Sequence, residues 1–309
     1  MDQITISSIT NYIGQLVLNN DILRANYNFD NITKGRVTFP LEKKDEILYI
    51  QTDGAMVNTR QTETIDKDKK SGWHENKLAL VYTSGNVSIR SRVLINGKYE
   101  YKHKINKKEY TSYIGDVSLF KKLVLSSALR NGYGQYKHTV LISDGATWIR
   151  NMKEELFPDA QQILDFYHLS EKIWDFSKLF FNKNETKYVP WSHEICDKLR
   201  DSDTNYVLKE IKHMEQSLKI KTNKLSNYIE NNINNIDYAE YTKKGYIIGS
   251  GAIESANKSV MQIRLKQPGM RWNIDSARYM VILRAKYESD LWFDNVIVPV
   301  KLHYNINPY

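Results

Sequence analysis

The sequence predicts an α/β fold, in which the strands of a sheet alternate with helices. Two short apolar runs, at 139–143 and 161–166, are each followed by apolar residues at helical spacing. A strand that passes into a helix twice in succession is typical of α/β proteins. Upstream, β-branched and aromatic residues at 47–52 and 77–95 predict further strands of the sheet.

The first half of the chain is expected to supply most of this sheet. Residues 1–45 are polar and weakly patterned, and we interpret them as a short N-terminal lead-in. The apolar run ILYIQT ends at Asp53-Gly54, a pair that is also typical of a tight hairpin turn. The segment 118–134 carries apolar residues at helical spacing and contains two glycines near its end, which predicts a helix.

The second half is expected to be mostly helical. After the strand TVLIS, apolar residues at helical spacing continue up to Pro158. Helical spacing also runs through 195–236, and a final helical block begins after the Gly-Ser-Gly sequence at 249–251. We expect this block to end near Trp292 and to break at Pro268-Gly269, because proline and glycine interrupt helices.

Composition narrows the classes of partner and compartment. Lys and Arg number 44 against 36 Asp and Glu, a formal net charge of +8 that favours a polyanionic partner without requiring one. The single cysteine, Cys196, excludes a disulfide framework and a cysteine-rich zinc finger, and fits a reducing compartment. No signal-like segment and no apolar run of roughly 18 residues is present, so we expect a cytoplasmic protein. The sequence has no glycine-rich phosphate-binding loop, so no nucleotide cofactor is implied.

Three acidic residues stand out by their expected positions. Asp53 and Asp144 each follow an apolar strand, and Asp144 precedes a helix, at the edge where open α/β sheets bind ligands. Glu254 lies in the first turn of a predicted helix. Each has an ordinary alternative, which is a hairpin turn for Asp53, a loop or helix cap for Asp144, and stabilisation of the helix dipole for Glu254.

Together the three acids predict a metal site. Clustered carboxylates repel one another, which raises their pKa values unless cations lie among them. Hard oxygen ligands on separate elements suit Mg²⁺ or Mn²⁺. Two such ions about 4 Å apart can activate a water or 3′-hydroxyl and stabilise the leaving oxygen of a phosphodiester. We therefore predict that Asp53, Asp144 and Glu254 form a divalent-metal site that cuts and joins DNA.

The surrounding motifs resemble those of bacterial insertion-sequence transposases related to the Mutator superfamily. They are LYIQTDGA around Asp53, LISDGATWI around Asp144, FPDAQQILDFYHLSE, and GSGAIESANKSVMQIRLKQPGMRWNIDSARYMVILRA around Glu254. The last motif is highly specific, and the resemblance covers roughly residues 46–292. It implies a ribonuclease-H-like mixed sheet flanked by helices, with a helical insertion between the second Asp and the Glu.

The resemblance also implies a division of the chain. The first part of the ribonuclease-H-like core then spans residues 46–165, and the helical insertion spans 166–245. Residues 246–292 form the core helix with the catalytic Glu and a basic segment. Residues 293–309 remain as a C-terminal tail.

By the same resemblance, Asp53, Asp144 and Glu254 are the acidic triad of a DDE transposase and hold two Mg²⁺ or Mn²⁺ ions. The segment Asp165-Phe-Tyr-His168 is similar to a motif of Cys or Asp and His, separated by two residues, close to the catalytic centre. We expect His168 to act there by positioning a substrate phosphate or the flanking DNA. The alternative is a histidine that is hydrogen-bonded within the α/β core.

A basic stretch follows the predicted catalytic glutamate. The stretch is expected to neutralise DNA phosphates, which would make binding sensitive to salt. Its basic residues are Lys258, Arg264, Lys266, Arg271, Arg278, Arg284 and Lys286. A solvated helix face is the alternative. Trp272 could stack on an unpaired base at a cut end, although a tryptophan in an amphipathic block more often packs in a core.

These observations predict the catalytic domain of a transposase, which cleaves DNA at transposon ends and transfers the freed strand to target DNA as a homodimer or larger synaptic complex. The alternative is a truncated or domesticated remnant that binds DNA without transposing. It is supported because only about 45 residues precede the first strand, whereas the resembled enzymes carry a longer region that recognises transposon ends. A two-carboxylate glycosidase needs only an acid pair, and explains neither the GSGAIES block nor the basic stretch.

Overall fold

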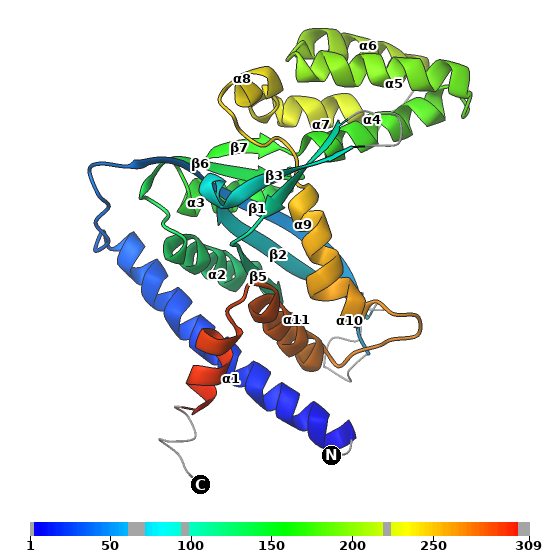
Figure 1. The fold of residues 1–309 in the computed structure, drawn as a ribbon. Helices are drawn as coiled ribbons and strands as arrows, with labels where there is room; N and C mark the ends of the chain where they lie inside the picture. The colour runs from blue at the N-terminus through cyan, green and yellow to red at the C-terminus, as the bar shows by residue number, and fades with distance from the viewer. Residues whose placement is uncertain (1–2, 61–71, 94–98, 219–223, 302–309) are drawn as a thin grey trace. The chain divides into compact units, whose positions relative to one another are not determined.

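Figure 1 shows the fold as a computed structural model, which describes residues 3–60, 72–93, 99–218 and 224–301. The chain divides into two units. Unit 1 comprises Met1–Thr139, Glu154–Pro158 and Gly251–Tyr309, and unit 2 comprises Val140–Lys153 and Asp159–Ser250. Within the described residues, no helix is both long and apolar enough to cross a bilayer.

The central feature is a five-stranded mixed sheet with helices around it, so the predicted α/β class is confirmed. Its strands are β1 (Lys44–Asn58), β2 (Trp73–Thr83), β5 (Glu109–Ile114), β6 (Tyr136–Ser143) and β7 (Gln161–Leu164), in the order β5-β2-β1-β6-β7. Strand β2 pairs antiparallel with both β1 and β5, whereas β6 and β7 are parallel. Strand β6 begins in unit 1 and ends in unit 2.

Strand β1 does not end where the sequence predicts. It runs through Asp53-Gly54 without a turn, with Asp53 opposite Leu78 and Gly54 opposite Lys77 of β2. Both the strand end and the hairpin turn expected at Asp53 are therefore wrong. The physical reason is that Gly54 remains extended, without the positive φ that a tight turn of this type requires.

A second, two-stranded sheet follows β2. A short 3₁₀ turn, η1 (Ser84–Asn86), leads into β3 (Val87–Val93), which pairs antiparallel with β4 (Tyr99–Ile105). The strand segment expected at 77–95 is therefore divided between two sheets. Its last two positions, 94 and 95, lie outside the described residues.

The lead-in expected at residues 1–45 contains a long helix, α1 (Gln3–Thr33). Its buried apolar side chains are few, and they include Val17, Leu18 and Ala25. Because most of its other apolar residues are exposed, the segment carries little of the periodic signal from which a helix is predicted. The helix is stabilised by packing against other helices of unit 1, which sequence periodicity does not show.

Helix α1 packs closely on α11 (Ile274–Glu288). A Cβ atom at Gly14 would collide with Tyr279 of α11, so the close approach of the two helices requires glycine at this position. Further along, Asp21 forms an ion pair with Lys286 at 2.8 Å, and both side chains are largely buried. A glycine contact and a buried ion pair therefore fix where the two helices cross.

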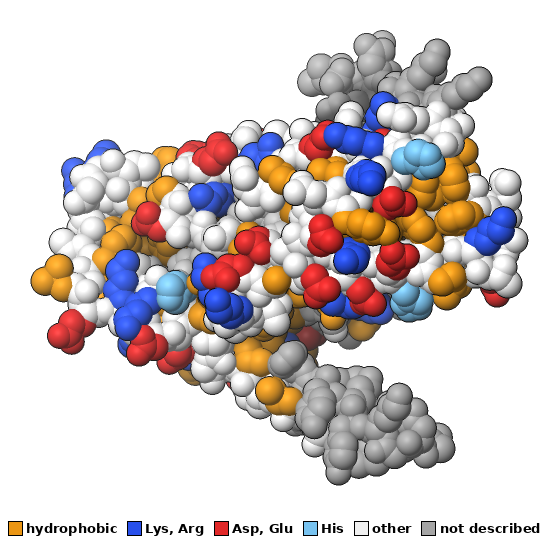
Figure 2. Space-filling view, turned by 90° about the horizontal axis from the view of Figure 1, so that it is seen from above, with side chains coloured by type: hydrophobic (Ala, Val, Ile, Leu, Met, Phe, Trp, Pro, Cys, Tyr) orange, Lys and Arg blue, Asp and Glu red, His pale blue; other side chains and the backbone are white. Residues whose placement is uncertain are grey.

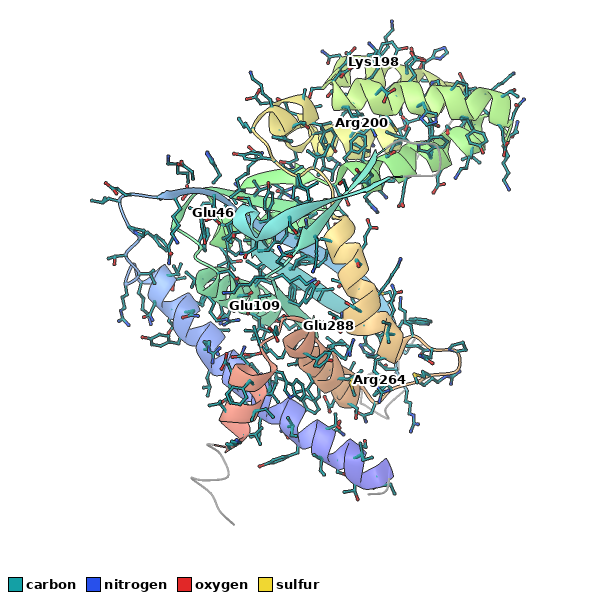
Figure 3. The ribbon with its side chains drawn as sticks, viewed as in Figure 1. Glu46, Glu109, Lys198, Arg200, Arg264 and Glu288 are labelled. Carbon is teal, nitrogen blue, oxygen red and sulfur yellow. The ribbon has the colours of Figure 1, made fainter. Side chains whose placement is uncertain are left out.

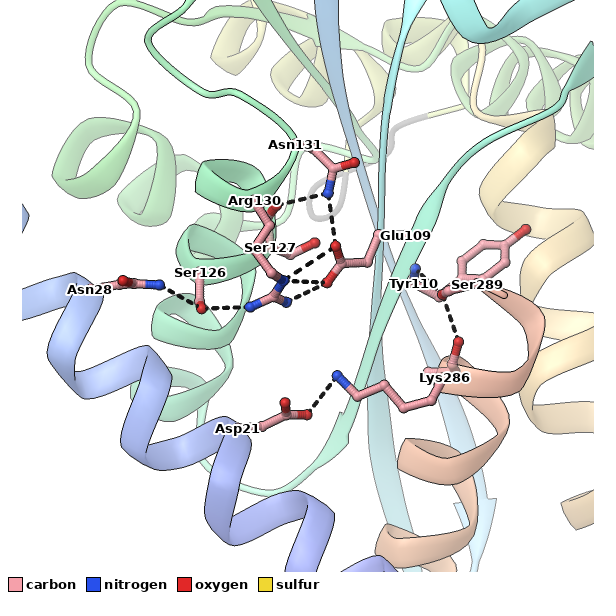
Figure 4. Close-up of polar contacts among 11 residues, drawn as sticks. Asp21, Asn28, Glu109, Tyr110, Ser126, Ser127, Arg130, Asn131, Lys286 and Ser289 are labelled. Atoms are coloured by element: carbon pink, nitrogen blue, oxygen red, sulfur yellow. Dashed lines mark hydrogen bonds and ion pairs between the residues drawn. The ribbon is translucent and has the colours of Figure 1, made fainter. Parts of the chain in front are cut away.

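A polar network connects α1 to the sheet through α2 (Val117–Arg130) and β5, as Figure 4 shows. Glu109 of β5 is 5% exposed and accepts hydrogen bonds from Arg130 and Asn131. Arg130 also donates to Ser126 at 2.9 Å, and the Ser126 hydroxyl accepts a hydrogen bond from Asn28 of α1 at 2.8 Å. The network therefore satisfies a carboxylate that would otherwise be buried unpaired.

Unit 2 is mainly helical beyond β7. Helix α3 (Thr147–Leu156) follows β6, and the later elements are α4 (Phe166–Phe180), α5 (Glu185–Arg200), α6 (Thr204–Ser217), α7 (Leu225–Asn231), η2 (Ile233–Asn235) and α8 (Tyr238–Lys243). Helices α4 and α5 pack together, joined by a buried hydrogen bond of 2.6 Å between Ser177 and Ser192. Of the region expected as a helical insertion, 166–245, the described residues form helices α4 to α8 and η2, and residues 219–223 lie outside the described part.

The C-terminal part of unit 1 carries the glutamate predicted to be catalytic. Its elements are α9 (Gly251–Ala256), a π-helical turn η3 (Asn257–Gln262), α10 (Ile263–Leu265), α11 and a second π-helical turn, η4 (Phe293–Ile297). The break expected at Pro268-Gly269 is confirmed, since it lies between α10 and α11. Of the tail expected at 293–309, residues 302–309 lie outside the described part of the chain.

Candidate metal centre

Asp53 lies in the interior of β1, where pairing with Leu78 of β2 holds its backbone. Its side chain is half-buried, and Oδ1 accepts a hydrogen bond of 2.7 Å from the N–H of Gly54. The other carboxylate oxygen, Oδ2, accepts a hydrogen bond of 2.6 Å from the Asn257 side chain.

Glu254 lies in the first turn of α9, as predicted, and its side chain is exposed. The helix forms here because Ile253 and Ala256 bury its inner face. The same inner face continues through Val260 of η3, which is fully buried. Glu254 is therefore carried on the outer side of an element that is anchored by apolar packing.

Two side-chain hydrogen bonds attach this helix to β1, on either side of Glu254. The Oε1 atom of Gln51 accepts from the N–H of Ile253 at 3.2 Å, and Asn257 donates to Asp53. Gln51 and Asp53 are two residues apart on one strand and therefore point to the same face of the sheet. The first of these bonds satisfies one of the N–H groups that a helix leaves unpaired at its start.

The two hydrogen bonds place the helix that carries Glu254 against the strand that carries Asp53, within unit 1. Glu254 and Asn257 are three residues apart on consecutive helical turns, so their side chains are neighbours on one helix surface. Asn257 contacts Asp53 directly. Sequence reasoning did not identify Gln51 or Asn257, although a glutamine inside the apolar run ILYIQT was a visible signal.

Asp144 follows the end of β6 and precedes α3, as predicted, and it belongs to unit 2. Its Oδ1 accepts a hydrogen bond of 3.0 Å from the N–H of Ala146, and its backbone carbonyl accepts one of 2.6 Å from the Tyr228 hydroxyl. Burial raises the pKa of Tyr228, and the negative charges of Asp144 and Asp165 raise it further. The Tyr228 hydroxyl therefore stays protonated and keeps donating to the Asp144 carbonyl.

The Asp165-Phe-Tyr-His168 segment begins α4. Asp165 is 2% exposed and caps the helix by accepting from the N–H of Tyr167 at 2.8 Å. Its carboxylate also accepts a hydrogen bond from the hydroxyl of Ser250, and the N–H of Phe166 donates to the carbonyl of Ile248 at 3.0 Å. Two motifs that lie far apart in the sequence are thus joined in unit 2.

His168 lies in the first turn of α4, half-buried. For the residues described, its side chain has no hydrogen-bond partner, so no such bond holds it in the core. The alternative of a hydrogen-bonded core histidine has no support in this geometry. Its expected role in positioning phosphate or DNA stays a prediction.

The donor set suits a hard divalent cation. Asp53 and Glu254 supply carboxylate oxygens in unit 1, and beside them the Oδ1 atom of Asn257 is buried without a hydrogen-bond partner among the described residues. Oxygen donors of this kind prefer Mg²⁺ or Mn²⁺. Across the described ranges, no group of three His, Cys, Asp or Glu side chains is placed to hold a metal ion.

Four of the basic residues after Glu254 are exposed, as both a DNA surface and a solvated helix face require. They are Lys258, Arg264, Lys266 and Arg271, and none forms an ion pair with another described residue. Arg264 is labelled at the end of the Glu254 helix in Figure 3. By contrast, basic and acidic side chains are interspersed on the face drawn in Figure 2.

Three other basic residues of this stretch have structural roles. Arg278 pairs with Asp275, Arg284 pairs with Glu288, and Lys286 pairs with Asp21. Trp272 had two expected roles, in the core or stacked on a base, and it packs against the buried cluster that contains Val57, Met261 and Leu265. This packing favours the core alternative over stacking on a base.

The backbone of Trp272 connects the end of β1 to the loop before α11. Its carbonyl accepts from the N–H of Arg60 at 2.7 Å, and Thr59 and Trp272 form a parallel bridge. Arg60 is exposed and was not identified from the sequence. Its backbone therefore lies next to that of Trp272, the residue that follows the exposed Arg271.

No protein-family model matches the chain, and no curated protein is similar to it.

Proposed function

We propose that the chain is the catalytic domain of a DDE transposase, which cleaves DNA strands with divalent metal ions and joins the freed 3′ end to target DNA. The observation that carries this proposal is the attachment of the Glu254 helix to the Asp53 strand by two hydrogen bonds. Two buried polar side chains, those of Gln51 and Asn257, form these bonds between the helix and the strand. A helix needed only for packing would not require them.

The proposed roles follow from the positions of the acids. Asp53 and Glu254 bind cations from β1 and α9, and Asp144 contributes a third carboxylate from the turn after β6. Mg²⁺ or Mn²⁺, when bound, activates the attacking oxygen and stabilises the leaving one. The exposed Lys258, Arg264, Lys266 and Arg271 hold the phosphates of the DNA. His168 positions a phosphate or the flanking DNA.

The architecture agrees with this proposal at a coarse level. A mixed sheet flanked by helices, with Asp53 on an antiparallel strand and the helices α4 to α8 and η2 between Asp144 and Glu254, is what a ribonuclease-H-like domain with a helical insertion would present. A homodimer or larger complex is part of the proposal, because synapsis brings two transposon ends together.

The test is metal-dependent nicking of supercoiled plasmid DNA. Wild type is expected to nick with Mg²⁺ or Mn²⁺ and to stop on addition of EDTA. Asp53→Asn and Asp144→Asn should each lose at least about 100-fold in rate, while the matched control Asp175→Asn, an exposed acid of α4, should retain it. Nicking that needs no metal, or that survives both substitutions, refutes the proposal.

A second function is favoured by the basic surface alone. Four exposed cations without described ion-pair partners bind DNA phosphates whether or not the acids hold a metal. The chain would then be a transposase remnant that binds DNA without transposing. Salt-sensitive DNA binding by wild type, together with no cleavage under any metal condition, is the result that selects it.

A further inference from the structure

Asn257 lies where the helix that carries Glu254 changes from α to π winding. It is 4% exposed, and its Nδ2 donates to Oδ2 of Asp53 at 2.6 Å. Its Oδ1 is buried and has no hydrogen-bond partner among the described residues. The one described hydrogen bond of this carboxamide therefore goes to the carboxylate of Asp53.

An amide at such a position lowers stability. Burying a polar group is unfavourable when one of its hydrogen bonds is not formed, and the neighbouring buried residues Val260 and Met261 are apolar. A leucine branches at the same atom, although it is larger, and it has no polar atom to leave unpaired. Packing does not explain why the residue is asparagine, whereas its contact with Asp53 does.

We propose that Asn257 is a positioning residue of the metal site, which holds the Asp53 carboxylate in one orientation. The N–H of Gly54 holds one carboxylate oxygen and Asn257 holds the other, so rotation of the carboxylate is restricted. A ligand whose orientation is already fixed loses less freedom when it binds an ion, and the affinity rises. This inference rests on the proposed function, because it requires Asp53 to be a metal ligand.

The test measures Mn²⁺ binding to the full chain without DNA, by isothermal titration calorimetry, together with thermal unfolding in EDTA. Asn257→Leu is expected to weaken Mn²⁺ binding about 10- to 100-fold, as loss of such supporting contacts typically does. Its melting temperature should be equal to that of wild type or higher. Gln262→Leu, a polar-to-apolar change at a half-buried position of the same helix, should leave both quantities unchanged.

A second pair of variants keeps the test decisive if the leucine does not fold. Asn257→Gln retains the carboxamide donor on a longer side chain, and Asn257→Met is of similar length without one. The glutamine variant should bind Mn²⁺ more tightly than the methionine variant. Equal affinities in this pair, or wild-type affinity in Asn257→Leu, would overturn the inference.

Asp53→Asn separates this inference from the proposed function. If wild type binds Mn²⁺ and Asp53→Asn does not, the metal site stands, and wild-type binding by Asn257→Leu then overturns the role of Asn257 alone. If wild type and Asp53→Asn give the same titration, with or without binding, both the metal site and the role of Asn257 are overturned.

Discussion

Gln51 offers the sharpest test of how the Glu254 helix is held. Its side chain is 1% exposed, accepts from the N–H of Ile253 and donates to the Tyr82 hydroxyl at 2.9 Å. In Gln51→Leu, the N–H of Ile253 and the Tyr82 hydroxyl both lose their hydrogen bonds to this side chain. Each buried group left unpaired costs about 1–3 kcal/mol, and the apolar leucine returns part of that loss. We expect the free energy of unfolding to fall by about 2–4 kcal/mol.

The assay is urea denaturation of a double-mutant cycle with Tyr82→Phe. Removing both partners of a buried hydrogen bond costs less than removing one, so the double variant should be more stable than the sum of the single changes, by about 1–2 kcal/mol. Nicking should fall about 10-fold or more in Gln51→Leu under conditions where it is folded, because the start of the Glu254 helix is loosened. Tyr82→Phe leaves the bond between Gln51 and Ile253 in place and serves as the control for nicking.

Two results would refute this reasoning. One is a Gln51→Leu variant whose stability lies within about 0.5 kcal/mol of wild type, which is the range of an ordinary surface substitution. The other is full nicking activity in a variant with the expected loss of stability. In that case the hydrogen bond would stabilise unit 1 without affecting the position of Glu254.

Three further predictions concern the metal site, the DNA surface and the core. Tyr228→Phe removes the hydrogen bond to the Asp144 carbonyl, so the free energy of unfolding, measured by thermal denaturation, should fall by about 1 kcal/mol and the rate of nicking should fall as well. A wild-type rate of nicking in this variant would contradict the prediction. Arg264→Ala should reduce the slope of log affinity against log salt by about 0.9 in DNA-binding anisotropy, and an unchanged slope would exclude a phosphate contact. Arg130→Met leaves Glu109 buried without its cation, and should lower the free energy of unfolding, measured in urea, by about 2–4 kcal/mol, a value that allows for the partial exposure of the arginine. A loss below about 1 kcal/mol would show that the network of Figure 4 contributes little to stability.

Local pattern was enough to predict the strand-to-helix units. The turn from β6 through Asp144 into α3, and from β7 through Asp165 into α4, appears in the sequence as an apolar run followed directly by helical spacing. Glu254 in a first helical turn was predictable for the same reason. In each case the signal lies within about one or two dozen consecutive residues.

Long-range contacts account for what the sequence could not show. Asp53 appeared to end a strand because Asp-Gly is a frequent turn pair, and only pairing with β2 keeps it extended. Helix α1 depends on packing against helices distant in sequence. Gln51 reaches Ile253 across a separation of 202 residues, and Asn257 reaches Asp53 across 204. A single sequence contains no local signal for either contact.

The π-helical turn η3 has a consequence for the length of the chain around Glu254. Ile253 and Leu265 are both buried, yet they are twelve positions apart, which in a regular α-helix places them about 120° apart around the axis. A π turn accommodates one additional residue, which reduces that angle to about 20°. Deleting one residue between 257 and 262 would therefore leave a regular α-helix in which Ile253 and Leu265 are still about 20° apart. Winding the unchanged chain as a regular α-helix would instead turn everything beyond the π turn by about 100°, so Leu265 would leave the buried side and the exposed Arg264 would be displaced from its surface.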